Sequence, residues 1–177
     1  SQTWLMVNGQ LKGSASEGLK YLQQTPLKAA VNNAFDDWVA KGDLTTKLNA
    51  RISLSGNPEA NNIRVSSGLS NVDVRLNNLN LAFSKINGEV IYDTANGLSA
   101  SNLQLDSFSG QALANIESTQ SDNGFDIAIT AKGKAELAPI KSWMPLFFMQ
   151  PITGALDYDL SFFIRPPQRG GIELNIN

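Results

Sequence analysis

The stretch DLTTKLNARISL, from Asp43 to Leu54, alternates between a largely apolar and a polar set of residues. Leu44, Leu48 and Ile52 belong to the apolar set, whereas Lys47 belongs to the polar set. Successive side chains of a β-strand point to opposite faces of its sheet. The stretch therefore predicts a strand with one apolar face and one face in water. It leaves open whether the apolar face buries a protein core or a ligand.

The composition of the chain excludes several classes of function. A formal charge of −2 over 177 residues gives no electrostatic basis for binding nucleic acid. The chain contains no cysteine and no histidine, which rules out Ser-His-Asp and Cys-His catalysis and removes the commonest metal ligands. We therefore expect a protein that is not an enzyme and that holds no cofactor and no metal ion.

Neither a signal peptide nor a membrane span is visible in the sequence. The first residues, SQTWLMVNGQ, have no basic start and no apolar run, and they read as the middle of a strand. The most apolar stretch, Trp143 to Met149, is much shorter than the roughly 20 residues needed to cross a membrane. We expect the chain to be a section of a longer protein.

Alternation continues along most of the chain and predicts a mainly β fold with short helices. Turn signals separate the alternating stretches, among them SGNP, NG and SDNG. The apolar parity changes at Asn77-Asn78, which indicates a bulge or a turn between two strands. Strands are predicted at 3–12, 43–54, 62–66, 71–83, 86–92, 98–105, 111–119, 124–131, 154–165 and 172–176.

Two helical stretches interrupt the strands. The first covers 16–24 and continues, after the start signal Thr25-Pro26, to a stop at Gly42. Its apolar stripe includes Phe35 and Trp38, for which we expect core packing. The second runs from Glu136 to about Gln150, and its aromatic residues Trp143, Phe147 and Phe148 either pack on the sheet or cover a groove.

The two ends of the chain have the same order of features. A strand, a glycine, helical residues, a second glycine and a long alternating strand occur in both, with Gly13 and Gly42 corresponding to Gly133 and Gly154. This order predicts an internal repeat at about 3–54 and 125–165, with helical inserts at about 14–41 and 135–150. A repeat of this kind is typical of an extended array.

Two pairs of carboxylates are the only candidates for a cation site. Asp157 and Asp159 share one strand face and offer oxygen ligands that suit a hard cation. Asp36 and Asp37 are neighbours on the polar side of the predicted helix. A solvated surface is the simpler interpretation of both pairs.

The apolar strand faces are more extensive than the predicted helices can cover. Two sheets packed as a sandwich would bury these faces against one another. A single antiparallel sheet that curls on itself would instead form an apolar trough that suits acyl chains. The residue pattern alone leaves both arrangements open.

The order of these features resembles the AsmA-like family of periplasmic proteins, most closely its YhdP-type branch, with TamB-like relatives as an alternative. The similar stretches are GLKYLQQTPL, KGDLTTKLNARISL and NVDVRLNNLNLAFSKINGEVIYDTANGLSASNLQLDSFSGQALANI. The resemblance implies a curled, β-taco-like antiparallel groove that repeats along a longer array, with helices at one edge or end. It also implies an inner-membrane-anchored protein of the Gram-negative periplasm that carries phospholipids toward the outer membrane.

On this resemblance, we expect the chain to be a groove segment whose partners are phospholipid acyl chains and, through other parts of the protein, the two membranes. The alternative is a structural or interaction β-sandwich module of an envelope assembly protein. Edge strands are expected to contact other chains. The candidate groove residues are Leu44, Leu48, Ile52, Val72, Val74, Leu76, Leu79, Leu81, Phe83, Ile86, Val90, Leu103, Leu105, Ile127, Ile129, Leu156, Leu160 and Phe162.

Overall fold

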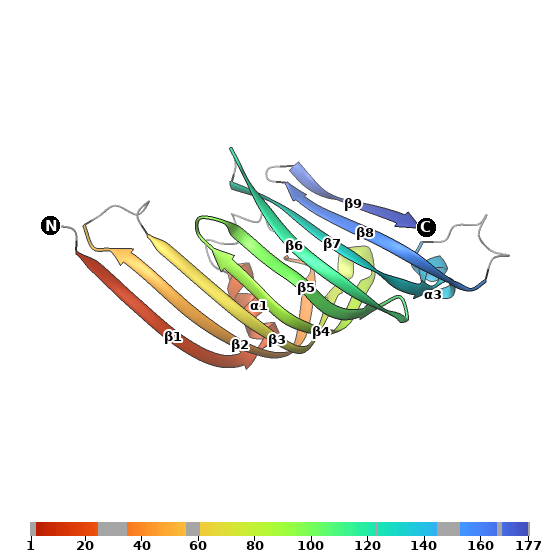
Figure 1. Ribbon diagram of the computed structural model, residues 1–177, viewed down its shortest axis with the longest axis horizontal. Coiled ribbons are helices and arrows are strands. Elements are labelled where there is room, and N and C mark those ends of the chain that lie inside the picture. The colour runs from red at the N-terminus through yellow and green to blue at the C-terminus, as the bar shows by residue number, and fades with distance from the viewer. Residues whose placement is uncertain are drawn as a thin grey trace.

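The computed structural model describes residues 3–24, 35–55, 61–122, 124–144, 153–165 and 168–176. Nine strands form one antiparallel sheet in which every strand pairs with the next along the chain (Figure 1). The predicted mainly β fold is confirmed. The strands are β1 Trp4–Ser14, β2 Trp38–Ser53, β3 Asn62–Leu76, β4 Leu81–Asp93, β5 Gly97–Ser107, β6 Gly110–Ser121, β7 Gly124–Glu136, β8 Ala155–Arg165 and β9 Gln168–Ile176.

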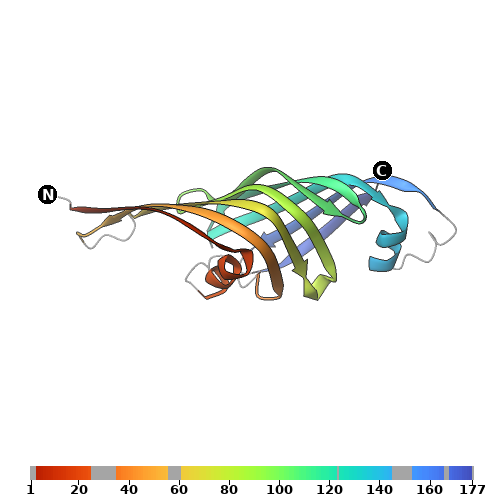
Figure 2. The same ribbon diagram turned by 90° about the horizontal axis from the view of Figure 1, so that it is seen from below.

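The sheet is open, with β1 and β9 as its two edges. It is arched and twisted, and the helices α1 and α3 lie on the same side of it (Figure 2). The sheet is neither closed nor strongly curled, so the expectation of a curled trough is corrected. All nine described strands belong to one sheet, so the two-sheet sandwich is not formed either. Side chains from the helices and from the segment before β2 occupy the inner side, so the strands need not roll over it to bury their apolar face.

Helix α1, Ala15–Gln24, confirms the helix predicted at 16–24. Its start is a reciprocal cap: the Glu17 amide donates to Ser14 Oγ at 3.2 Å, and the Ser14 amide donates to Glu17 Oε2 at 3.0 Å. Helix α3, Leu137–Trp143, begins where the second helical patch was predicted. Residues 25–34 and 145–152, including Phe147 and Phe148, lie outside the described residues.

The prediction of a helix that ends at Gly42 is wrong for its last part. Phe35–Asp37 form a turn, which also holds Asp36, and Trp38 is already the first residue of β2, opposite Leu76 of β3. Gly42 has φ +114° and lies in the strand at a register shift between β2 and β3. Gly42 therefore lies opposite a bulge of β3, where Asn71 and Val72 face it, and is not a helix stop, because pairing with β3 outweighs the helical spacing of the local apolar residues.

A line of bulges crosses three neighbouring strands. It starts opposite Gly42 of β2 and passes through Asn71 in β3, Lys85 in β4 and Asn102 in β5, whose φ angles are +48°, +51° and +54°. Each of these three amides donates a hydrogen bond to a side chain of an adjacent strand. Asn71 donates to Asn87 Oδ1 at 3.0 Å, Lys85 to Asp73 Oδ1 at 3.0 Å and Asn102 to Asn115 Oδ1 at 2.9 Å. Bulges bend strands and increase their twist, so this line accounts for the arch of the sheet.

The bulges also return apolar residues to one face after each change of parity. In β3 the inward residues change from Leu69 to Val72 across Asn71, so 62–66 and the start of 71–83 belong to one strand. The short 3₁₀ helix η2, Asn77–Leu79, then separates β3 from β4. Of the two explanations for the parity change at Asn77-Asn78, the structure has the turn.

Candidate functional site

The candidate site is the inward side of the sheet, called here the apolar face, on which α1 and α3 pack. Every candidate groove residue lies on this face or, for Leu79, packs against it from η2. Apart from Leu48 and Ile52, all of them belong to or pack against two connected clusters of buried side chains. The alternation in the sequence therefore predicted correctly that these residues share one face. This holds whether the face forms a core or binds a ligand.

The centre of the apolar face is filled by the protein's own side chains. Val72, Leu76 and Leu81 are each 3% exposed, and Leu160 is 4% exposed. Ile140 of α3 is completely buried over this region. The described centre is therefore a packed core.

The part of the apolar face on the first three strands is open. Leu5 and Val7 of β1 lie opposite Ile52 and Ala50 of β2, and Val65 of β3 lies opposite Leu48. Leu5 is 45% exposed and Leu54, after β2, is 59% exposed. We call this surface the open wing; it comprises Leu5, Val7, Leu48, Ile52, Leu54, Ile63 and Val65.

An aromatic bridge crosses the apolar face from the start of β2 to β8. The ring of Trp38 lies 4.7 Å from that of Phe35 and 6.2 Å from that of Phe162, with edge-to-face geometry in both pairs. Phe35 is 6% exposed and packs in one cluster with Ile127 and Ile164 of β7 and β8. Core packing of Phe35 and Trp38 is confirmed. Both pack against strands that are far from β2 in the sheet order.

Helix α1 holds this bridge in place. Gln23 Nε2 donates to the backbone oxygen of Phe35 at 2.7 Å and to that of Trp38 at 3.5 Å. A Cβ at Gly18 would lie 2.6 Å from Leu44 Cδ1, so α1 approaches β2 closely at a position where only glycine fits without a shift. The helix, the turn and β2 therefore form one packed unit on the apolar face.

A second contact links α3 to the turn between β3 and β4. Trp143 Nε1 donates to the Leu79 backbone oxygen at 2.7 Å, and the Trp143 ring lies 5.5 Å from Phe108. Trp143 thus packs on the sheet, as one of its two interpretations predicted. Beside it, the hydroxyls of Ser107 and Tyr158 are buried without a well-formed hydrogen bond to a described residue. Burial raises the pKa of Tyr158, and the nearby Ser107 hydroxyl opposes this shift.

The outward side of the sheet carries ion pairs. Lys132 Nζ lies 2.7 Å from Asp159 and Lys134 Nζ lies 3.4 Å from Asp157, so neighbouring lysines balance both carboxylates of the candidate cation pair. Lys85 Nζ lies 2.8 Å from Asp106, and this hydrogen bond raises the pKa of Lys85. These ion pairs are consistent with an outward face that is in contact with water.

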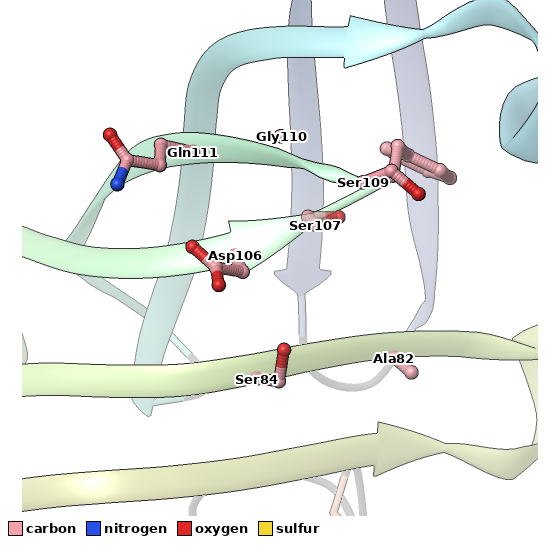
Figure 3. Close-up of a pocket in the computed structure, with 8 residues that line it drawn as sticks. Ala82, Ser84, Asp106, Ser107, Ser109, Gly110 and Gln111 are labelled. Atoms are coloured by element: carbon pink, nitrogen blue, oxygen red, sulfur yellow. The ribbon is translucent and has the colours of Figure 1, made fainter.

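A shallow pocket lies on this outward side, between β4 and the β5–β6 hairpin (Figure 3). The polar side chains that line it are Ser84, Asp106, Ser107, Ser109 and Gln111, and Asp106 already pairs with Lys85. Within the described ranges, no group of three or more acidic residues could hold a metal ion. The pocket therefore presents serine hydroxyls and one carboxylate that already has a cationic partner.

The sequence did not predict the aromatic bridge. The alternation in residues 43–54 did predict the apolar face to which Leu48 and Ile52 of the open wing belong. Trp38 has the same parity as Leu44, so extending the strand to Trp38 would have placed the indole on the apolar face. Its contact with Phe162 had no sequence signal, because the two residues lie on strands that do not pair.

The fold and the site define a class: an open antiparallel β-sheet with one apolar face, of which part is filled by side chains and part is exposed. A family model described as YhdP protein matches residues 1–177, and the chain belongs to the YhdP family. The resemblance seen in the sequence is thereby confirmed. No curated protein and no solved structure matches the chain. None of the helices in the described part is long and apolar enough to cross a membrane.

Proposed function

We propose that this chain is a section of a groove that carries phospholipids between the inner and outer membranes, and that acyl chains lie on its apolar face. The observation that carries the proposal is the open wing, an apolar surface on which Leu5 is 45% exposed and Leu54 is 59% exposed. Contiguous exposed apolar surface marks a site of interaction. Membership of the YhdP family supports an envelope location for that interaction.

The chemistry of the wing suits an acyl chain. No charged residue is among its members, and Lys47 and Arg51 of β2 have the opposite parity and point to the outward side. Each methylene group that leaves water contributes about 0.8 kcal/mol, so a chain of ordinary length gains several kcal/mol from such a surface. On this proposal, the arched sheet is one part of a longer groove in the periplasm, anchored to the inner membrane by other parts of the protein.

One observation favours the alternative of a structural or interaction module. The centre of the apolar face is a packed core, with Leu76 and Leu81 each 3% exposed. If the whole face serves as a core in solution, it leaves no path for lipid. The two candidate functions therefore differ in what a charge on the open wing does.

The test compares Leu48→Asp with Lys47→Asp. Leu48 lies in the open wing, and Lys47 is its neighbour on the outward side. Phospholipid loading is measured by native mass spectrometry and the fold by circular dichroism. We expect Leu48→Asp to lose lipid and keep the fold, because an open surface lets the carboxylate reach water once lipid is absent, whereas burying an unpaired charge beside acyl chains is costly.

Lys47→Asp is the matched control, since it changes the charge more than Leu48→Asp does and should leave loading unchanged. Unfolding of Leu48→Asp would support the structural module. Equal loss of lipid from both variants would contradict the distinction between the two faces.

A further inference from the structure

The row of residues that leads from the open wing across the sheet ends under Phe35. Strand pairing places Leu48 opposite Val65, Val65 opposite Tyr92, and Tyr92 opposite Leu98. This row runs from β2 to β5 on the apolar face, over about 15 Å at the usual spacing of strands. At its far end, Leu98 packs against the cluster that contains Phe35.

From Leu98 the row continues through Ser118 of β6, whose hydroxyl hydrogen-bonds the Leu98 backbone, to Ile127 and Ile164, and Phe35 packs over these two isoleucines. The phenyl ring is 6% exposed, and with it pack Ile127, which is 2% exposed, and Ile164, which is 3% exposed. An apolar side chain thus lies where an acyl chain that extends from the wing would lie. The exposed side chains Leu5 and Leu54 lie at one end of this row, and the buried Ile127 and Ile164 lie at the other, beneath the ring.

The attachment of this segment differs from that of the strands. Phe35–Asp37 form a turn that lies outside the sheet, and regular pairing with β3 begins only at Trp38. We call Phe35–Trp38 the strap. The strap is held by hydrogen bonds from Gln23, by a 3.2 Å hydrogen bond from the Asn77 amide to the Asp37 oxygen, and by the two aromatic contacts of Trp38.

We propose that the strap is an autoinhibitory element: Phe35 covers the acyl path where it passes from β5 to β8, and a bound acyl chain displaces it. The exchange keeps Ile127 and Ile164 out of water in both states, because one apolar group replaces another. The open wing is then the first site that a chain occupies, and the surface beneath Phe35 is the second. This inference rests on the proposed function and adds a regulation of the same site.

The test maps where a lipid lies on the 177-residue chain. The probe is a phosphatidylglycerol with a diazirine on one acyl chain, and peptide mass spectrometry locates the adducts. Adducts at Leu48 and Val65 report the wing, and adducts at Ile127 and Ile164 report the covered surface. We expect Phe35→Ala to raise the covered-surface adducts about tenfold relative to those of the wing, since the ring no longer competes for the same contacts.

Phe163→Ala is the matched control. Phe163 is next to Phe162 on β8 but points outward, beneath the guanidinium of Arg165 at 4.9 Å from its ring centre. It should leave the distribution of adducts unchanged.

A second variant decides the question should Phe35→Ala fail to fold. The chain contains no cysteine, so Trp38→Cys with Phe162→Cys introduces its only two thiols. A bifunctional methanethiosulfonate then fastens the strap to β8, and a reductant releases it. We expect the fastened chain to keep wing adducts and lose covered-surface adducts, and reduction to restore them.

The outcomes separate the two proposals. Absence of adducts from the wing in every variant would overturn the proposed function. Adducts on the wing, with a covered-surface fraction that neither Phe35→Ala nor the fastened strap changes, would overturn the strap alone.

Discussion

At the scale of single residues, Tyr158 and Ser107 are unusual because their buried hydroxyls have no well-formed hydrogen bond within the described ranges. Tyr158 is 3% exposed, and its ring packs edge-to-face on Phe108 at 5.5 Å. A buried polar group without a partner costs free energy that an apolar replacement of the same shape does not. The ring of Tyr158, rather than its hydroxyl, therefore stabilises this end of the sheet.

We predict that Tyr158→Phe leaves the free energy of unfolding unchanged or raises it by about 1 kcal/mol. The measurement is urea denaturation followed by circular dichroism. Tyr158→Ala is the control and should lower the free energy of unfolding by about 3–5 kcal/mol, as large core deletions do. A clear loss of stability in Tyr158→Phe would mean that the hydroxyl makes a favourable contact.

At the scale of elements, the bulge line decides how the sheet bends. Gly42 needs its φ of +114°, and a Cβ there would lie 2.6 Å from the Asn71 oxygen and 2.8 Å from Val72 Cα. Gly154, before β8, has a similar φ of +128° but no atom within 4 Å of such a Cβ. Comparing substitutions at the two glycines therefore separates the cost of backbone strain from the cost of the clash with the neighbouring strand.

We predict that Gly42→Ala destabilises the protein more than Gly154→Ala does. Both variants carry the backbone penalty of about 1–2 kcal/mol for a left-handed residue with a Cβ. Only Gly42→Ala must also move β3, because the clash is with backbone atoms. Thermal unfolding of both variants checks this order, and equal effects would show that β3 shifts at no cost.

The cap of α1 gives the element a dependence on pH. The hydrogen bond from the Ser14 amide to the Glu17 carboxylate lowers the pKa of Glu17 from its ordinary value, and the hydrogen bond from the Ser14 hydroxyl lowers it further. A carboxylate with a lowered pKa contributes stability above its unfolded-state pKa and loses it as the pH falls through the folded-state value. We predict that Glu17→Gln removes the part of the helical signal that wild type loses as the pH falls below the ordinary pKa of a glutamate, about 4.3. Comparing the pH dependence of the 222 nm ellipticity of wild type and variant tests it.

At the scale of the whole molecule, two unpaired edges bound the sheet. With nine strands in an antiparallel meander, β1 and β9 run in the same direction. A copy added edge to edge in the same orientation would therefore pair β9 with β1 in parallel, whereas two β1 strands related by a two-fold axis pair antiparallel. The only charged side chain on β1 is Lys12, and Met6 is 62% exposed, so this edge has little protection against pairing.

We predict concentration-dependent association of the chain through β1. Met6→Lys should shift the sedimentation profile toward the monomer, since a charge on an edge strand opposes pairing. Met6 points outward, so this variant leaves the apolar face intact. Met144→Lys, at an exposed methionine after α3, is the control and should associate like wild type. A monomer at all concentrations would contradict the prediction.

The sequence by itself determined which residues share a face. Alternation is a local property, since each strand residue points opposite to its neighbour whatever the sheet does. Leu44, Leu103 and Leu160 could therefore be assigned to one apolar face before any pairing was known. The helix predicted from residue 16 and the parity change at Asn77-Asn78 are local signals too, and α1 begins at Ala15 and η2 separates β3 from β4 at Asn77.

Only the tertiary structure decided how that face is used. Whether Leu76 is a core residue or a lining residue depends on what lies above it, and that includes α3, which follows β7. The strand state of Trp38 depends on its pairing with Leu76, which outweighs the helical spacing around it. The strap depends on Phe35 reaching Ile127 and Ile164, and the bend and twist of the sheet set that distance. Contacts between residues so far apart in the chain leave no periodic trace in the sequence.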